Sequence, residues 1–119
     1  MKENTLIILS KQFAVDTVRL CEKIRENEKK NPLLNQLLRS GTSIGANIHE
    51  ANYAASKADF INKLQIALKE CYETDYWLDI FKCTDIITEE DYKEMYDKCS
   101  KIRKVLIASL NTAKKNIKE

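Results

Sequence analysis

The stretch that decides the fold runs from Leu38 to Phe60 and reads LRSGTSIGANIHEANYAASKADF. Its apolar and small residues, counted from slightly upstream, follow one another at alternating steps of three and four. This spacing is typical of a helix that buries one stripe against its partners. The stripe consists of Leu34, Leu37, Gly41, Ile44, Ile48, Ala51 and Ala55. The pattern predicts a helix that ends at about Tyr53.

Gly41 and Gly45 lie in the middle of this helix, among serine, threonine and alanine residues. Each glycine costs a helix interior about 1 kcal/mol relative to alanine. Two of them therefore indicate that another backbone comes close at this point. Two interpretations stay open: close helix packing inside one subunit, or a contact between subunits at Gly41 and Gly45.

Four polar residues line the far side of the same helix: Arg39, Ser43, Asn47 and Glu50. Their spacing places them on one face, opposite the apolar stripe. Arg39 and Glu50 lie roughly 16 Å apart along the helix axis, which is too far for a direct ion pair. Each of the two is expected to meet solvent, a side chain of another helix, or another subunit.

These residues carry a resemblance to a known family. Arg39, Ser43-Ile44, Asn47-Ile48 and Glu50, followed by Ser56-Lys57 and Phe60, resemble the motif of the bacterial 23S rRNA intervening-sequence protein family. That family is similar to the accessory variability protein of diversity-generating retroelements. The sequence departs from the family at Gly45, His49 and Ala51, where proline, alanine and glycine are common. The resemblance implies an up-down four-helix bundle that forms a ring, most often a pentamer, and a nucleic-acid or ribonucleoprotein association.

The length and composition favour a small helical protein. A chain of 119 residues predicts one domain over 1–119, and two glycines with one proline leave little material for strands and turns. The sequence predicts four helices: one in the N-terminal segment and three that begin at residues suited to the first turn of a helix. These start signals are Asn31-Pro32, Ser56 with Asp59, and Thr88 with Asp91. The first helix is expected over about 4–27. Short connections make neighbouring helices antiparallel, so the predicted fold is an all-α, antiparallel up-down four-helix bundle.

The predicted first helix carries a second apolar strip on its outer side: Ile8, Val15 and Val18, set among charged residues. A monomeric bundle has no use for such a strip, so it predicts an oligomer contact and a homo-oligomer. Tyr72, Tyr76 and Trp77 of the third helix are assigned to the core. Acidic residues surround them, whereas base stacking needs exposed rings beside basic residues.

The charge pattern of the fourth helix is asymmetric, with acids from Glu89 to Asp97 and bases from Lys98 onward. Four of the lysines fall on the face opposite the apolar stripe: Lys101, Lys104, Lys115 and Lys118. Two interpretations stay open. The charges complement the helix dipole, or the lysines form a stripe that binds the phosphates of RNA or DNA. The net charge of the chain is only +2 and does not decide between them.

The sequence predicts no catalytic, cofactor or metal site. The four cysteines, Cys21, Cys71, Cys83 and Cys99, form no C-x-x-C pair, and one histidine is present. No Glu-x-x-His pair, P-loop or catalytic triad pattern occurs, so no enzyme and no small-molecule substrate is predicted. No membrane span or signal peptide is visible, and a cytoplasmic protein is expected. Two functions stay open: a self-assembling protein associated with nucleic acid or ribonucleoprotein, or a protein-interaction scaffold without nucleic-acid contact.

Overall fold

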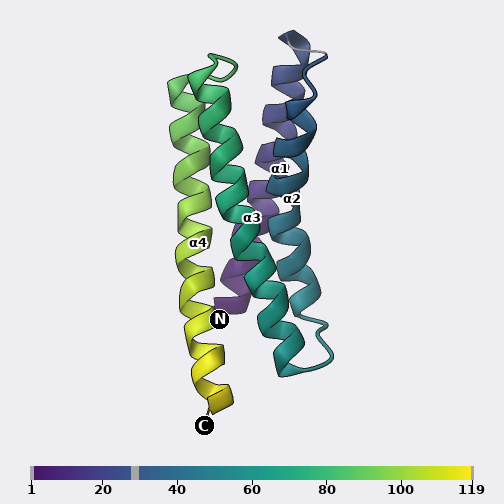
Figure 1. The fold of residues 1–119 in the computed structure, drawn as a ribbon, viewed down its shortest axis with the longest axis vertical. Coiled ribbons are helices and arrows are strands. Elements are labelled where there is room, and N and C mark those ends of the chain that lie inside the picture. Colours follow the sequence, from purple (N-terminus) through teal and green to yellow (C-terminus); the bar gives the residue numbers. More distant parts are fainter. Residues whose placement is uncertain (1, 28–29, 119) are drawn as a thin grey trace.

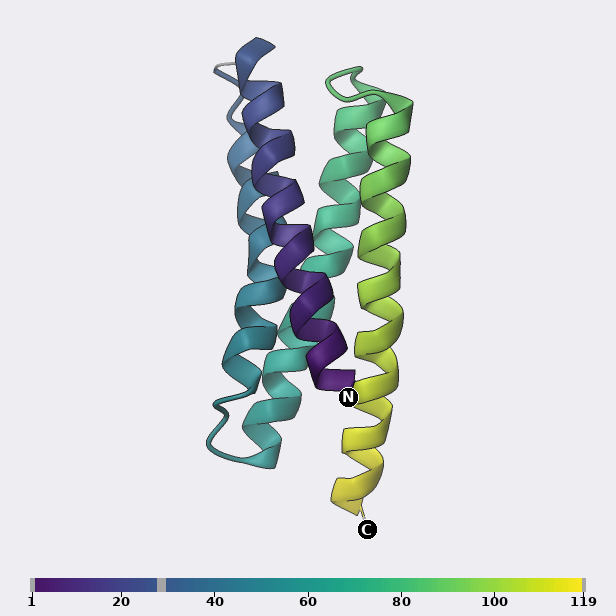
Figure 2. The same cartoon turned by 180° about the vertical axis from the view of Figure 1, so that it is seen from behind.

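Four helices form in the computed structural model: α1 (Lys2–Asn27), α2 (Leu33–Ala51), α3 (Lys57–Cys83) and α4 (Glu89–Lys118). The structure describes the backbone of residues 2–27 and 30–118 and the side chains of residues 5–27 and 30–116. The helices run alternately up and down, and helices that follow one another in the sequence pack side by side (Figure 1). Seen from behind, α1 also packs against α4 (Figure 2). The predicted all-α up-down four-helix bundle is confirmed, and the described residues contain no strand.

Three helices begin where the sequence supplies an oxygen for the free N–H groups of the first turn. In each case a side-chain oxygen accepts a hydrogen bond from a backbone N–H two or three residues later. The bonds are Asn31 Oδ1 with Leu33 N–H (2.9 Å), Ser56 Oγ with Asp59 N–H (3.0 Å), and Thr88 Oγ1 with Asp91 N–H (3.0 Å). The predicted start signals of α2, α3 and α4 are therefore confirmed.

The apolar stripe of α2 is buried from Leu34 to Ala51, as the spacing predicts. The helix ends at Ala51 rather than at Tyr53, and the chain turns away toward α3. Ala55 lies beyond this end and is exposed, so its assignment to the stripe is wrong. All four helices contribute to the largest fully buried side chains of the core, which include Phe13, Leu37, Ile44, Leu78 and Phe81.

The two glycines of α2 face α1 of the same chain. A Cβ atom added at Gly41 would lie 2.6 Å from Thr17 Cγ2, and one added at Gly45 would lie 3.2 Å from the Ser10 backbone oxygen. Thr17 and Ser10 are both buried. Gly41 is itself buried by α1, which supports close helix packing inside one subunit at this position, and a subunit contact at Gly41 stays a prediction. Gly45 is half-buried, and a subunit contact there stays a prediction.

We expect the substitution Gly41→Ala to destabilise the protein by up to about 2 kcal/mol. Alanine favours the helix by about 1 kcal/mol, but the new methyl group overpacks a rigid contact, which costs about 1–3 kcal/mol. Urea denaturation followed by circular dichroism measures the difference. In the Thr17→Ala background the same substitution should cost less, because the side chain that it meets is shortened. An equal cost in both backgrounds would contradict the contact.

The aromatic residues of α3 divide between core and surface. Trp77 is half-buried, whereas Tyr72 and Tyr76 are 54% and 57% exposed, so their assignment to the core is wrong. Their positions turn outward because Cys71, Thr74 and Leu78 already form the buried stripe of α3. Apolar and aromatic composition alone does not distinguish these two faces of the helix.

Three of the four cysteines, Cys21, Cys71 and Cys99, are buried free thiols, and Cys83 is exposed. Burial raises the pKa of the Cys21 thiol to about 11. Hydrogen bonding to Cys71, together with burial, raises the pKa of Cys99. In the part of the chain that the structure describes, no group of three or more His, Cys, Asp or Glu side chains is placed to hold a metal ion. The buried cysteines therefore act as small apolar side chains.

We expect one thiol to react rapidly with Ellman's reagent at pH 8, and all four to react in denaturant. Cys83 is the exposed thiol, whereas the other three are buried, and burial also raises the pKa of the Cys21 and Cys99 thiols. Absorbance at the end of the fast phase measures the number of accessible thiols. Loss of the fast phase in Cys83→Ser identifies the residue, and two or more fast equivalents would contradict the buried arrangement.

No helix in the described residues has both the length and the apolar character needed to cross a bilayer.

Candidate functional site

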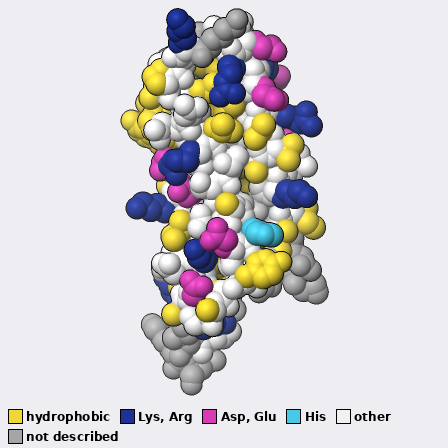
Figure 3. Space-filling view, turned by 90° about the vertical axis from the view of Figure 1, so that its right-hand side faces the viewer, with side chains coloured by type: hydrophobic (Ala, Val, Ile, Leu, Met, Phe, Trp, Pro, Cys, Tyr) yellow, Lys and Arg dark blue, Asp and Glu magenta, His cyan; other side chains and the backbone are white. Residues whose placement is uncertain are grey.

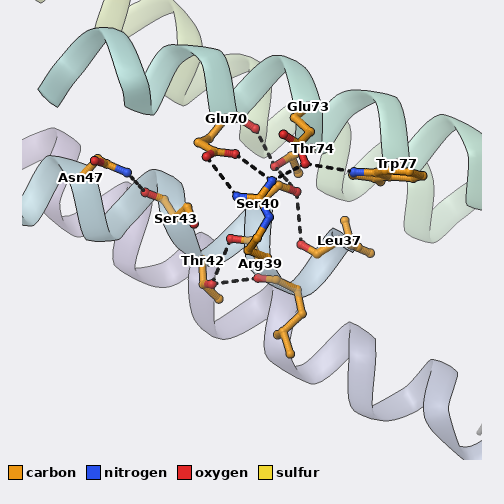
Figure 4. A network of polar contacts seen from close by, with 11 residues as sticks. Leu37, Arg39, Ser40, Thr42, Ser43, Asn47, Glu70, Glu73, Thr74 and Trp77 are labelled. Carbon is orange, nitrogen blue, oxygen red and sulfur yellow. Dashed lines mark hydrogen bonds and ion pairs between the residues drawn. The ribbon is translucent and has the colours of Figure 1, made fainter. Parts of the chain in front are cut away.

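Arg39, the first residue of the polar face of α2, reaches across to two glutamates of α3 (Figure 4). Its Nη1 and Nη2 atoms lie 3.2 and 3.4 Å from the two carboxylate oxygens of Glu70. Nη2 also pairs with Glu73. The hydrogen bond from Arg39 lowers the pKa of the Glu73 carboxyl group. The guanidinium group therefore holds the Glu73 carboxylate in its charged form and forms an ion pair with Glu70.

The same network continues into the core below Arg39. Trp77 Nε1 donates to the Glu73 carboxylate at 3.2 Å. The hydroxyl group of Thr74 lies 3.0 Å from Ser40 Oγ and 2.8 Å from the Glu70 backbone oxygen. Ser40 and Thr74 are both fully buried, so these contacts satisfy polar groups that would otherwise be costly inside the bundle.

The other end of the polar face also meets α3. Glu50 accepts a hydrogen bond from Lys63 Nζ at 2.9 Å. Between the two ends, Asn47 Nδ2 donates to the Ser43 backbone oxygen at 2.9 Å and stays on its own helix. Solvent, another helix and another subunit were the expected partners of Arg39 and Glu50. In the structure both residues pair with side chains of another helix of the same chain. Arg39 and Glu50 therefore tie α2 to α3, and each of them has a counter-ion on α3.

The basic residues of α4 divide into paired and unpaired ones. Lys98 pairs with Asp16 of α1 at 2.9 Å and with Glu94 at 3.1 Å. By contrast, Lys101, Lys104 and Lys115 are exposed and have no ion-pair partner among the described residues. The side chain of Lys118 lies outside the described residues. The outer face of α4 thus presents positive charge that the fold itself does not use.

A half-buried ion pair between Asp75 of α3 and Arg103 of α4 was not predicted from the sequence. The Arg103 guanidinium group also lies 5.5 Å from the Tyr72 ring centre and 5.7 Å from the Tyr96 ring centre. Asp75 Oδ1 is buried and has no hydrogen-bond partner. Desolvation raises the pKa of the Asp75 carboxyl group even though Arg103 opposes the shift. The acid and the base lie 28 residues apart on different helices, so no local sequence pattern reveals them.

A groove of about 210 Å³ lies between α1 and α4. Lys23 pairs with Asp91 across it at 2.9 Å, and the pair of Lys98 with Asp16 also joins the two helices. Leu20 and Met95 are the apolar side chains that line it. The opposite charges neutralise each other across the groove, so it offers no excess charge to attract an ionic ligand.

The outer strip of α1 is exposed, as predicted: Ile8 is 68%, Val15 is 37% and Val18 is 40% accessible to solvent. Two of these residues line a shallow groove of about 440 Å³ on the helix surface. Figure 3 shows apolar and charged side chains mixed over the side of the bundle that α1 and α2 form. The exposed strip of Ile8, Val15 and Val18 departs from the polar exterior expected of a solvated helix face.

Fold and surface together define a four-helix bundle with paired charges between its helices and an unpaired basic face on α4. A profile of the 23S rRNA-intervening sequence protein family matches residues 2–108, and the chain belongs to this family. It is also similar to a solved structure, that of a protein with unknown function from the S23 ribosomal protein family of Bacteroides thetaiotaomicron VPI-5482. The two share 47% sequence identity with a TM-score of 0.90, over 93% of this chain and 99% of the other. A search of curated proteins gave no match.

Proposed function

We propose that this protein is a non-enzymatic, self-assembling cytoplasmic bundle that binds nucleic acid or a ribonucleoprotein through the outer face of α4. The observation that carries the proposal is the exposure of Lys101, Lys104 and Lys115 without ion-pair partners among the described residues. Unpaired lysines on one face of a helix provide the sequence-independent charge that phosphate backbones attract. The family is named for an intervening sequence in 23S rRNA, which makes RNA the first ligand to test.

Assembly is part of the proposal. The exposed strip of Ile8, Val15 and Val18 supports a contact between copies, and the family resemblance implies a ring of five. A ring would repeat the lysine face around its circumference. Several weak phosphate contacts on one nucleic-acid strand then combine through a high effective concentration.

Binding rather than catalysis is favoured by how the acidic groups of the motif region are used. Glu70 and Glu73 share one face of α3, but Arg39 forms an ion pair with each of them. Glu50 is likewise paired with Lys63. Carboxylates held in structural ion pairs are poor candidates for a metal ligand, because a bound metal ion would have to compete with the positively charged side chain that each of them already contacts.

A protein-interaction scaffold without nucleic-acid contact is the second candidate. The exposed apolar strip of α1 is the observation that favours it, since aliphatic side chains contact proteins rather than phosphates. Under this alternative the lysines of α4 only complement the helix dipole.

We expect the change of Lys101, Lys104, Lys115 and Lys118 to glutamine to weaken binding to RNA or DNA uniformly across sequences. The slope of log affinity against log salt should flatten by up to about 0.7–0.9 for each lost phosphate contact. The melting temperature should hardly change, because the three described side chains are exposed. Mobility shift at two salt concentrations measures the binding, and circular dichroism measures the melt.

The matched control changes Lys30, Lys57 and Lys69 to glutamine and is compared with a triple variant that changes Lys101, Lys104 and Lys115. The three control lysines are also exposed but lie outside the α4 stripe. Equal loss of affinity in both variants would show that only net charge matters and would contradict a binding face on α4. Wild type that binds neither RNA nor DNA at low salt would leave the scaffold as the better candidate.

A further inference from the structure

The outer face of α1 carries a second seam of its own. Six residues follow one another at steps of three and four: Ile8, Lys11, Val15, Val18, Glu22 and Arg25. All six are exposed, and they lie opposite the buried stripe that contains Leu6, Phe13 and Leu20. Alternating steps of this kind are the a and d positions of a coiled coil. The free face of α1 is therefore patterned to pack against another helix.

Two charged residues of opposite sign in this seam are left without an ion pair by the described residues. Neither Lys11 nor Glu22 forms an ion pair with any described residue. Both line the shallow groove on the surface of α1, together with Val15 and Val18. One positive and one negative charge thus lie on either side of an apolar pair, on a surface that the fold leaves open.

This arrangement is complementary to itself when two copies run antiparallel. In an antiparallel coiled coil each a position of one helix faces a d position of the other. Val15 then faces Val18 of the partner subunit, and Lys11 faces Glu22 of the partner subunit. The two-fold symmetry repeats each contact, so the central layers are two valine pairs flanked by two ion pairs, and the two outermost layers place Ile8 against Arg25 of the partner subunit.

Other alignments do not match. A parallel pair places Lys11 against Lys11 of the partner subunit, and Glu22 against Glu22 of the partner subunit, which is repulsive. An antiparallel pair shifted by one heptad places Lys11 against Val15 of the partner subunit and leaves both charges unpaired. The charges therefore specify one orientation and one register, as charged and polar positions do in coiled coils generally.

We propose that α1 of one chain packs antiparallel against α1 of a second copy, about a two-fold axis that passes between residues 16 and 17. This inference rests on the proposed self-assembly and specifies its surface. A two-fold contact uses the same patch on both chains and closes on itself, whereas a ring needs two different patches. The α1 contact alone gives a dimer, and in a ring-forming protein it joins two rings into an assembly with an even number of chains.

The test is a charge reversal at the two seam positions. Lys11→Glu and Glu22→Lys each place two like-charge contacts in the symmetric interface, and we expect each to weaken the α1 contact by about tenfold or more. The double variant Lys11→Glu/Glu22→Lys restores opposite charges in every layer and should assemble like wild type. Sedimentation velocity over a concentration series measures the assembly. Lys93→Glu, a reversal at an exposed lysine of α4, is the control and should have no effect.

Cross-linking tests the register directly, in a Cys83→Ser background that removes the exposed thiol. Val15→Cys and Val18→Cys chains should form a disulfide-linked heterodimer when mixed and mildly oxidised, and neither chain should cross-link alone to the same extent. Equal cross-linking of the unmixed chains would overturn the register, and a double charge variant that fails to reassemble would overturn the pairing. Assembly that no reversal affects would overturn this inference alone. A wild-type monomer at tens of micromolar would overturn the proposed self-assembly with it.

Discussion

Replacement of Ile48 by aspartate is expected to leave the chain without a cooperative unfolding transition. Ile48 is 3% exposed and lies in the stripe of α2 that faces the core. The substitution removes a packed aliphatic side chain and buries a carboxylate in the apolar stripe, without a counter-ion. Together these effects cost about 4 kcal/mol or more, and a small domain has only about 5–15 kcal/mol of total stability. A molten or unfolded chain is the expected result.

Circular dichroism at 222 nm during heating measures this outcome, with near-ultraviolet dichroism as the probe of fixed packing. The control is Ile48→Val, which removes one methylene and should cost about 0.5–1.5 kcal/mol while the melt stays cooperative. If Ile48→Asp melted within a few degrees of wild type, the assignment of this residue to the core would be wrong.

The second large effect is expected at the ion pair of Asp75 and Arg103. Their side chains are only 17% and 15% exposed, so the change Asp75→Ala would leave a guanidinium group largely buried without its counter-ion. Loss of one member of a buried pair costs about 3–5 kcal/mol, and the residual exposure points to the lower end of that range, about 3 kcal/mol. Urea denaturation measures the loss as a lower midpoint at similar slope.

A double replacement separates this explanation from a simple loss of packing. In Asp75→Leu/Arg103→Met both charges are absent, and much of the stability should return, because apolar side chains of similar size often substitute for a buried ion pair. A double variant as unstable as Asp75→Ala would show that the shape of the pair, rather than its charge balance, is what matters. Neither variant substitutes Tyr72 or Tyr96, the two residues whose rings flank Arg103.

The sequence was sufficient to predict the helices, their starts and most of their buried stripes, because these depend on local periodicity and on one or two capping residues. Asn31, Ser56 and Thr88 each act within three residues of their own position. The buried residues of α3 also recur at steps of three and four: Leu64, Ala67, Cys71, Thr74, Leu78 and Phe81. The buried face of such a helix can be predicted wherever its apolar residues recur at steps of three and four.

The features that escaped prediction depend on how one helix is placed against another. Thr17 and Ser10 are polar by type, yet they are buried because they lie opposite the two glycines of α2. Tyr72 is apolar in bulk, yet it is exposed beside Arg103. The partners of Arg39 lie more than 30 residues away, on α3. Only the register between helices decides such contacts, and no local pattern contains that register.

The close contact of Gly41 with Thr17 has a consequence for how related sequences diverge. A side chain at position 41 has no room while threonine occupies position 17, since the added Cβ would meet two of its side-chain atoms at less than 3 Å. A smaller residue at position 17 makes room for a larger one at position 41. A larger residue at position 41 is poorly tolerated while threonine still occupies position 17. The two positions therefore form one unit of variation, in which the substitution on α1 comes before the substitution on α2.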